Sequence, residues 1–247
     1  MKTILITGAS RGIGAACAEL AAQAGYAVAL NYHRNHEAAQ AVAERIRTAG
    51  GTAELFPADV GAEEQVVSLF RAVDARFGRL DALVNNAGVI DRQMRVETMT
   101  AARINRMLTT NVTGPFLCAR EAVLRMSTRR GGQGGAIVNV SSRAAVLGSG
   151  NSYVDYAASK AALDTLTLGL AQEVANEGIR VNGVRPGLIY TDIHADGGEP
   201  GRVERLKTSV PMQRGGQPEE VARAILWLLS PEASYTTASF IDVSGGR

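Results

Sequence analysis

The sequence predicts a single α/β domain built on a doubly wound parallel sheet of about seven strands, with helices on both faces. Short runs of apolar, often β-branched residues alternate with longer stretches of helical periodicity from one end of the chain to the other. The first run is followed by a glycine-rich segment and then by a helical pattern. No linker or low-complexity tract interrupts the 247 residues, so we expect one domain over residues 1–247.

Composition excludes several classes of protein. Apolar residues make up 46 % of the chain, and the net charge is +2 with the basic residues scattered, so no nucleic-acid partner is indicated. Cys17 and Cys118 lie in apolar helical patterns and the three histidines form no cluster, so neither a disulfide framework nor a metal site is expected. No apolar run reaches about 18 residues, so no membrane association is expected. The first strand begins directly after Lys2, which leaves no room for a signal peptide and favours a cytoplasmic location.

The first strand, Thr3–Thr7, runs into the segment Gly8–Gly14 and an alanine-rich helix that Gly25 ends. Glycines let the chain turn tightly and let a phosphate approach the N–H groups at a helix start. The spacing is G-x-x-x-G-x-G and not the G-x-G-x-x-G of the common dinucleotide fingerprint. Its position between strand and helix nevertheless predicts a phosphate-binding loop and hence a Rossmann fold.

The end of the second strand, Ala27–Tyr32, bears on the choice of nucleotide. An acid at this point would bind the adenosine ribose hydroxyls of NAD and repel a 2′-phosphate. This chain has Asn31 there, with Arg34 following and Arg11 nearby in the glycine loop. We therefore expect NADP in preference to NAD, the alternative being that Arg34 is a solvated residue at the start of the next helix.

The next elements alternate regularly and end in polar residues. We expect a helix over 36–50, a strand over 53–58 that ends in Asp59 and Val60, a helix over 63–77 and a strand over 80–84. The last of these runs into Asn85-Asn86-Ala87-Gly88. This tetrapeptide could be only a turn, or it could bond the backbone between strands and leave a flat surface for a ligand.

The longest helical stretch, Ala101–Met126, contains two residues that do not suit a regular apolar face. Asn111 falls on the same stripe as Ile104, Leu108 and Cys118, and a polar side chain there should have a partner. Pro115 lacks the N–H that would bond the Asn111 carbonyl, so the helix should bend there and free that carbonyl to hold a water. The alternative is a structural kink alone.

The segment Ser142–Lys160 follows a strand at 136–140 and leads into a helix. If Tyr156 opens that helix, Lys160 lies one turn further on the same face. An ammonium about 4 Å from a phenol, at an effective dielectric of roughly 20, favours the phenolate by up to about 4 kcal/mol, or about three pK units. The pair could then exchange protons near neutral pH, with Ser142 at the carboxyl end of the strand. A surface pair is the alternative reading, and Tyr153 is a competing phenol.

The remaining elements complete the alternation. The helix from Tyr156 should end at Gly178, a strand over 179–184 leads to Pro186, Gly187 and Thr191, and a helix over 218–229 precedes a last strand over 240–243. Residues 192–217 have little apolar periodicity and are long for a connection. We interpret them as a mobile lid over a substrate, with a short helix from Pro200 to Lys207.

Together these motifs resemble the short-chain dehydrogenase/reductase superfamily over nearly the whole chain. The branch most similar includes 3-ketoacyl-carrier-protein reductases and glucose dehydrogenases. The resemblance implies that Tyr156 donates a proton to the substrate oxygen as hydride arrives from the nicotinamide. It also implies that Lys160 lowers the pKa of Tyr156 and bonds the nicotinamide ribose, that Ser142 holds the carbonyl oxygen, and that Asn111 positions a water. Ser142 is chosen over Ser141 because it lies one residue further past the strand.

The resemblance also implies the cofactor site and the assembly. Asp59 and Val60 would flank the adenine, and Ile189 and Thr191 the nicotinamide carboxamide. Members are commonly tetramers, so we expect a homotetramer. The full set of expected cofactor-binding residues is Gly8, Ser10, Arg11, Gly12, Ile13, Gly14, Asn31, Arg34, Asp59, Val60, Asn85, Ala87, Gly88, Tyr156, Lys160, Pro186, Gly187, Ile189 and Thr191.

The leading functional hypothesis is an NADP-dependent oxidoreductase that interconverts a carbonyl compound and a secondary alcohol. Within that class, a sugar dehydrogenase of the glucose type and a 3-ketoacyl reductase both remain open. A ketoacyl reductase should carry a basic patch for its acidic carrier, and Arg129-Arg130 is a candidate, although a solvated loop explains it as well. The alternative class is a non-catalytic cofactor-binding sensor or scaffold on the same fold, which would have no need to keep Tyr156 and Lys160.

Overall fold

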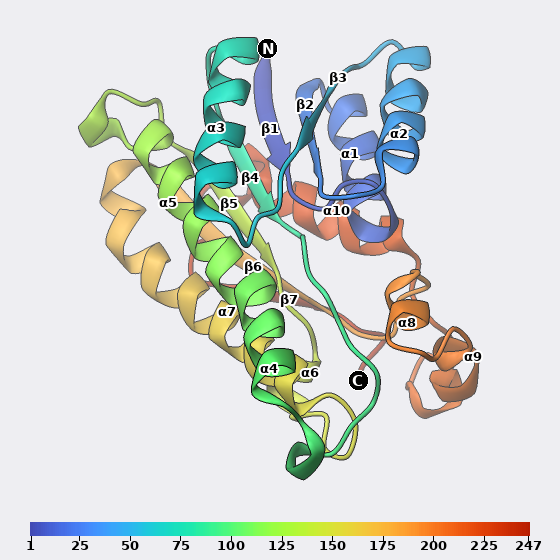
Figure 1. Cartoon of the computed structure of the whole chain (residues 1–247). Helices are drawn as coiled ribbons and strands as arrows, with labels where there is room; N and C mark the ends of the chain where they lie inside the picture. Colours follow the sequence, from blue (N-terminus) through green and yellow to red (C-terminus); the bar gives the residue numbers. More distant parts are fainter.

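The computed structural model describes all residues 1–247 and contains one seven-stranded, entirely parallel sheet in the order β3-β2-β1-β4-β5-β6-β7 (Figure 1). Each predicted strand is present within one or two residues of its expected ends. The strands are β1 (Lys2–Ile6), β2 (Tyr26–Tyr32), β3 (Thr52–Pro57), β4 (Ala82–Asn85), β5 (Gly135–Val140), β6 (Ile179–Pro186) and β7 (Phe240–Val243).

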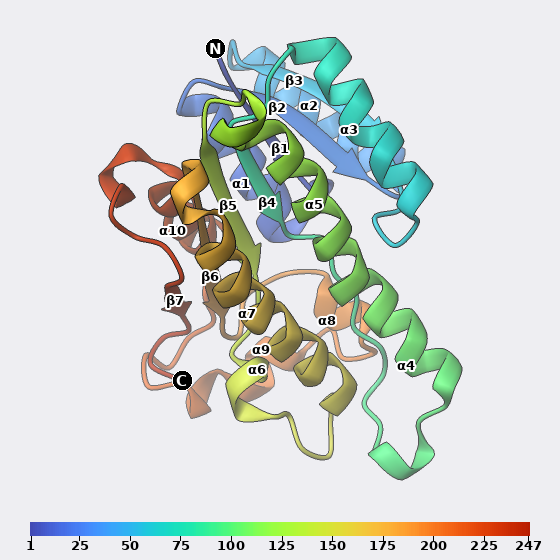
Figure 2. The same ribbon diagram turned by 90° about the vertical axis from the view of Figure 1, so that its left-hand side faces the viewer.

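Helices cover both faces of the sheet, because side chains of each strand alternate between two apolar cores. Ile4 and Ile6 of β1 belong to the core under α1, α2 and α10, whereas Leu5 belongs to the core under α3, α5 and α7 (Figure 2). The helices are α1 (Gly12–Gln23), α2 (His36–Thr48), α3 (Glu63–Phe77), α4 (Ala101–Leu108), α5 (Gly114–Met126), α6 (Ala144–Leu147), α7 (Val154–Val174), α8 (Ile193–Asp196), α9 (Arg202–Leu206) and α10 (Pro218–Leu229). None of them combines the length and the apolarity that a bilayer crossing requires.

The strand order reverses between β1 and β4, which pair directly through Ile4–Ile6 and Ala82–Val84. Connections leave these two strands in opposite directions, so their carboxyl ends open a crevice that no crossover covers. The glycine-rich loop follows β1, and Asn86 to Gly88 follow β4, so both predicted motifs lie at this reversal point. This is where a doubly wound sheet binds ligands.

The stretch expected as one helix over 101–126 is divided. A π-helical turn, Thr109–Thr113, separates α4 from α5, so the irregularity falls beside Pro115, as its missing N–H predicts. The expected stripe is wrong at Leu108, whose side chain is exposed, because the extra residue of the turn rotates α4 relative to α5.

Two elements near the site also differ from expectation. α7 begins at Val154 and not at Tyr156, so Tyr156 already lies within the first turn. The segment 192–217 contains the expected short helix as α9. It also contains α8, which was not predicted because four residues are too few to show a helical period. α6, α8 and α9 all lie beyond the carboxyl ends of the strands (Figures 1 and 2).

Candidate active site

A single cleft of about 1350 Å³ lies along the carboxyl ends of the strands. This volume exceeds the roughly 300–1,000 Å³ of common ligand pockets and has room for a dinucleotide together with a small substrate. The predicted site residues that line it are Gly8, Ser10, Arg11, Gly12, Ile13, Asn31, Arg34, Asp59, Val60, Ala87, Gly88, Ser142, Tyr156, Lys160, Pro186, Gly187, Ile189 and Thr191.

Three predicted residues do not line the cleft. The side chain of Asn85, predicted as a cofactor contact, is buried, and its amide donates to Asn139 Oδ1 at 2.9 Å and to the Pro115 carbonyl at 3.4 Å. Gly14 serves packing, since a Cβ there would lie 2.5 Å from both Asn86 Nδ2 and the Gly8 carbonyl. Asn111 is fully buried behind the wall of the cleft.

The glycine loop has the geometry of a phosphate cradle. Gly8 and Gly12 have φ of +63° and +54°, a region that side chains disfavour. A Cβ on Gly8 would lie 2.9 Å from Ala87 Cα, and one on Gly12 would lie 3.2 Å from Thr191 Cγ2. Asn86 fixes the loop by donating to the carbonyls of Thr7 and Gly8 at 2.9 and 3.0 Å. The residues present therefore fit a bound dinucleotide.

Beyond the glycine loop, the end of β2 is tied to its neighbours through Asn31. Its side-chain oxygen accepts from Gly8 N at 3.3 Å, and its amide donates to the carbonyls of Phe56 and Ala58, each at 3.1 Å. Asn31 therefore shapes this end of the cleft through backbone bonds. Arg34 is exposed at the same end and makes no ion pair or side-chain hydrogen bond.

At the other end of the cleft, Ser142 and Tyr156 meet. Burial raises the pKa of Tyr156, and the adjacent Ser142 hydroxyl, which can donate to the phenolate, lowers it by less. Ser142 Oγ also accepts from the N–H of Ala144 at 3.1 Å, which orients its hydroxyl. Ser141, by contrast, donates to the carbonyl of Lys160 at 3.2 Å. The geometry thus separates the two serines as the sequence suggested.

Lys160 is buried, and its ammonium lies 5.8 Å from the centre of the Tyr156 ring. Nζ donates to the Val140 carbonyl at 2.8 Å and does not reach the phenol oxygen. Burial lowers the pKa of Lys160 to about 8, partly opposed by the charge of Asp164. In this arrangement the ammonium faces a backbone carbonyl, so the lowering of the Tyr156 pKa by Lys160 stays a prediction.

Asn111 has the partners that its position predicted. Its Oδ1 accepts from Val89 N at 2.8 Å, and its Nδ2 donates to the Val89 carbonyl at 2.9 Å and to Ser159 Oγ at 3.0 Å. The π-helical turn therefore joins the segment after β4 to α7, through residues that directly adjoin Gly88 and Lys160. Through Val89 and Ser159, Asn111 braces two segments that border the end of the cleft where Ser142 and Tyr156 lie.

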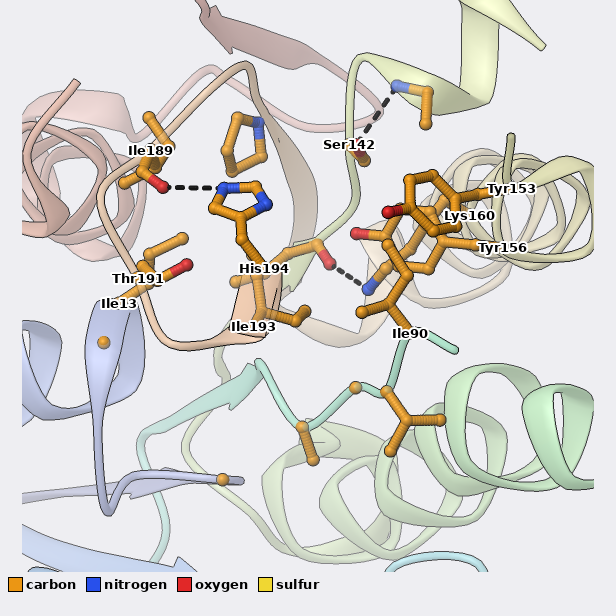
Figure 3. A pocket seen from close by; sticks show the side chains of 18 of the residues that line it. Ile13, Ile90, Ser142, Tyr153, Tyr156, Lys160, Ile189, Thr191, Ile193 and His194 are labelled. Carbon is orange, nitrogen blue, oxygen red and sulfur yellow. Dashed lines mark hydrogen bonds between the residues drawn. The ribbon is translucent and has the colours of Figure 1, made fainter. Parts of the chain in front are cut away.

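Tyr153, which the sequence offered only as a competing phenol, and His194, to which it gave no individual role, also line this end (Figure 3). Tyr153 is buried under the guanidinium of Arg202, which lies 5.0 Å from its ring centre. His194, from α8, contacts the Ile189 carbonyl through Nε2 at 3.0 Å. No spacing rule pairs either residue with the motifs, because α8 reaches the cleft only through the fold of the segment 192–217. Asp196 of α8 forms an ion pair with Arg11 of the glycine loop.

A parallel sheet with a glycine cradle at its reversal point and a Ser–Tyr–Lys group in the same cleft defines a nicotinamide-dependent oxidoreductase. A sequence model of the family "Enoyl-(Acyl carrier protein) reductase" matches residues 8–247. The chain belongs to the short-chain dehydrogenase/reductase superfamily, and it is an enzyme that acts on carbonyl and alcohol groups.

Individual relatives agree over the whole length. The chain is 62 % identical over 247 residues to an uncharacterized oxidoreductase YgfF of Escherichia coli, covering 100 % of both chains. The crystal structure of a 3-ketoacyl-(acyl-carrier-protein) reductase from Brucella melitensis complexed with NADH is similar with a TM-score of 0.91 and 32 % identity, covering 100 % of this chain and 98 % of that one. The crystal structure of a short chain dehydrogenase from Burkholderia cenocepacia in complex with NADP is similar with a TM-score of 0.91 and 33 % identity. The match covers 99 % of this chain and 97 % of that one.

Proposed function

We propose that the protein is an NADP-dependent oxidoreductase that interconverts a carbonyl compound and a secondary alcohol, with Tyr156 as the general acid and base. The observation that carries this proposal is the meeting of Ser142 and Tyr156 in the same cleft as the glycine cradle. A sensor or scaffold would need the cradle but not a serine beside a tyrosine at its far end.

The cofactor would lie along the cleft, with its pyrophosphate at Gly8–Gly14, its adenine at Asp59 and Val60, and its nicotinamide between Ile189 and Thr191 and the Tyr156 end. NADPH, when bound there, supplies the hydride. The preference for NADP rests on the end of β2, where Asn31 stands in place of an acid and the unpaired Arg34 can meet a 2′-phosphate.

The chain itself handles the proton and the oxygen. Ser142, held by the N–H of Ala144, donates a hydrogen bond to the substrate oxygen and orients it toward the phenol. Tyr156 transfers its proton to that oxygen during reduction and takes it back during oxidation. When Lys160 turns from the Val140 carbonyl toward a bound ribose and the phenol, its charge stabilises the phenolate.

The proposed assembly is a homotetramer in the cytoplasm. A groove between α5 and α7 has exposed apolar side chains, among them Phe116 and Leu124, along its length. Basic residues Arg129 and Arg130 lie at one helix end and Glu173 lies on the other helix. A two-fold related copy could therefore satisfy both the apolar surface and the charges.

The decisive experiment measures oxidation of NADPH over a panel of diketones, ketoacyl thioesters, aldoses and aromatic aldehydes. The wild type is compared with Tyr156→Phe. We expect turnover with one substrate class and a loss of at least about a thousandfold in the variant, since the proton donor is removed. Thioester or aldose turnover would identify a ketoacyl reductase or a sugar dehydrogenase. Tight NADPH binding without any turnover would contradict the proposal and favour the sensor.

A further inference from the structure

His194 is the one histidine in the catalytic half of the cleft, and its hydrogen bond assigns its protonation state. Nε2 lies 3.0 Å from the carbonyl oxygen of Ile189. A carbonyl can only accept, so Nε2 carries the proton and Nδ1 is left with a free lone pair in the neutral ring. Burial lowers the pKa of His194, which favours this neutral form near pH 7.

Nδ1 of His194 has no partner. It is shielded from solvent, yet no donor of the protein reaches it. Buried acceptors without a donor are uncommon, and at a cleft they indicate a group that a ligand completes. In Figure 3 this edge of the ring faces the side of the cleft that carries Tyr153 and Tyr156, whereas the opposite edge faces Ile189.

The short helix α8 that carries His194 is held in place by backbone bonds. The backbone carbonyl of His194 accepts from Glu199 N at 2.8 Å, and the carbonyl of Ile193 accepts from Gly197 N at 3.0 Å. The ion pair of Asp196 with Arg11 ties the same short helix to the glycine loop. The acceptor is therefore presented at a defined position beside the reacting group.

Apolar side chains line part of this end of the cleft, together with the polar side chains of Ser152 and Arg202. Ile90, Leu147, Tyr153, Ile193 and Leu206 contribute to its lining. Ser142 and Tyr156 are committed to the reacting oxygen in the proposed reaction. Among the residues that line the cleft, only His194 Nδ1 is an acceptor that is buried without a donor, so a polar group of the substrate that reaches it must be a donor.

We propose that His194 is a specificity-determining residue whose Nδ1 accepts a hydrogen bond from a substrate hydroxyl close to the reacting carbonyl. The inference rests on the proposed function and names its substrate class as hydroxyketones, with the corresponding diols in the reverse direction. The apolar lining suits a carbon-rich remainder. A hydroxyl-free ketone would leave Nδ1 unpaired and be reduced less well.

The test compares ketones that differ only in the hydroxyl: acetoin against butanone, and phenacyl alcohol against acetophenone. Values of kcat/KM with NADPH are measured for the wild type, for His194→Phe, which keeps an aromatic ring of similar width without the acceptor, and for His194→Asn, whose amide oxygen can replace Nδ1. His36→Phe is the matched control, since His36 lies on α2, bonds Tyr32 and does not line the cleft.

We expect the wild type and His36→Phe to prefer the hydroxylated member of each pair by about tenfold or more, the size of one well-made hydrogen bond. In His194→Phe the ratio should fall to near one, and His194→Asn should restore part of it. If His194→Phe leaves the ratio of kcat/KM values unchanged, or lowers kcat/KM equally for both members of a pair, the role of His194 is overturned. The proposed reductase activity is not contradicted by either result. A rise in the Kd of NADPH in place of a changed ratio also overturns it, because the ring would then serve the cofactor. Failure to reduce any ketone contradicts the proposed reductase itself.

Discussion

A single side chain, Arg34, carries the proposed discrimination between the two nicotinamide cofactors. Because it makes no ion pair in the protein, its charge is available to a 2′-phosphate, and a charge-assisted bond of this kind contributes roughly 1.5–3 kcal/mol. We expect Arg34→Ala to raise the Kd of NADPH by about tenfold to a hundredfold and that of NADH by less than about threefold, measured by fluorescence titration. Arg45→Ala, an exposed arginine of α2 paired with Glu19, is the control. Equal weakening of both cofactors would contradict the assignment.

Lys160 predicts a pH dependence of stability. Its pKa is about 8 in the folded protein against an ordinary value of 10.5, so burial disfavours the charged form. The destabilisation is fully present below pH about 8 and is relieved as the pH rises toward 10.5, because the unfolded chain then binds more protons. Relative to Lys160→Met, the wild-type free energy of unfolding should rise by up to about 3 kcal/mol over this window.

Urea denaturation of both proteins between pH about 7 and pH about 10 checks this prediction. The comparison with Lys160→Met removes the contributions of other groups, including Tyr156, whose raised pKa acts in the opposite sense at higher pH. A difference between wild type and variant that stays constant with pH would show that Lys160 keeps its ordinary pKa in the folded state.

The π-helical turn at Thr109–Thr113 matters through Asn111, whose side chain bonds both backbone groups of Val89. Asn111→Ala leaves these groups and Ser159 without that partner, so the free energy of unfolding should fall by about 2–3 kcal/mol in urea denaturation. Activity should fall as well, because Val89 and Ile90 line the cleft. Asn105→Ala, on the exposed face of α4, is the matched control. An equal, small effect of both substitutions would refute the bracing role.

Elements with strong local signals were predictable, and those fixed by distant contacts were not. Pro218, followed by two glutamates, predicted the first residue of α10. The apolar period over 63–77 predicted both ends of α3. Pro115 likewise located the break between α4 and α5. The start of α7 was missed because Tyr153 carries no capping signal, and α8 was missed because four residues show no period.

The site shows the same division. The glycine and Tyr-x-x-x-Lys patterns predicted residues that the structure brings together in one cleft, because their arrangement depends on neighbours in the sequence. Which way a polar side chain turns depends on the fold, so Asn85 proved to bond Asn139 and Lys160 to bond Val140. His194 could not be assigned at all, since its partner groups lie on other elements.

At the scale of the whole molecule, the groove between α5 and α7 predicts self-association. Phe116 and Leu124 are 50 % and 43 % exposed there, which is unusual for large apolar side chains that line one groove. Light scattering at micromolar concentration should give a mass about four times the 26.0 kDa of one chain. Leu124→Glu should give a smaller species, because each two-fold contact would bury unpaired carboxylates, whereas Val96→Glu, 57 % exposed and distant from the groove, should not.

Assembly should also affect catalysis, because α7 carries Tyr156 and Lys160 at one end and one wall of the groove along its length. Packing a second copy against α7 limits the motion of its first turn, so the dissociated Leu124→Glu variant should lose activity while its circular dichroism stays that of the wild type. Raising the protein concentration should restore both mass and activity together if the substitution only weakens the contact. A wild type that is monomeric in light scattering, or a Leu124→Glu variant that keeps the wild-type mass, would show that this groove is not the interface.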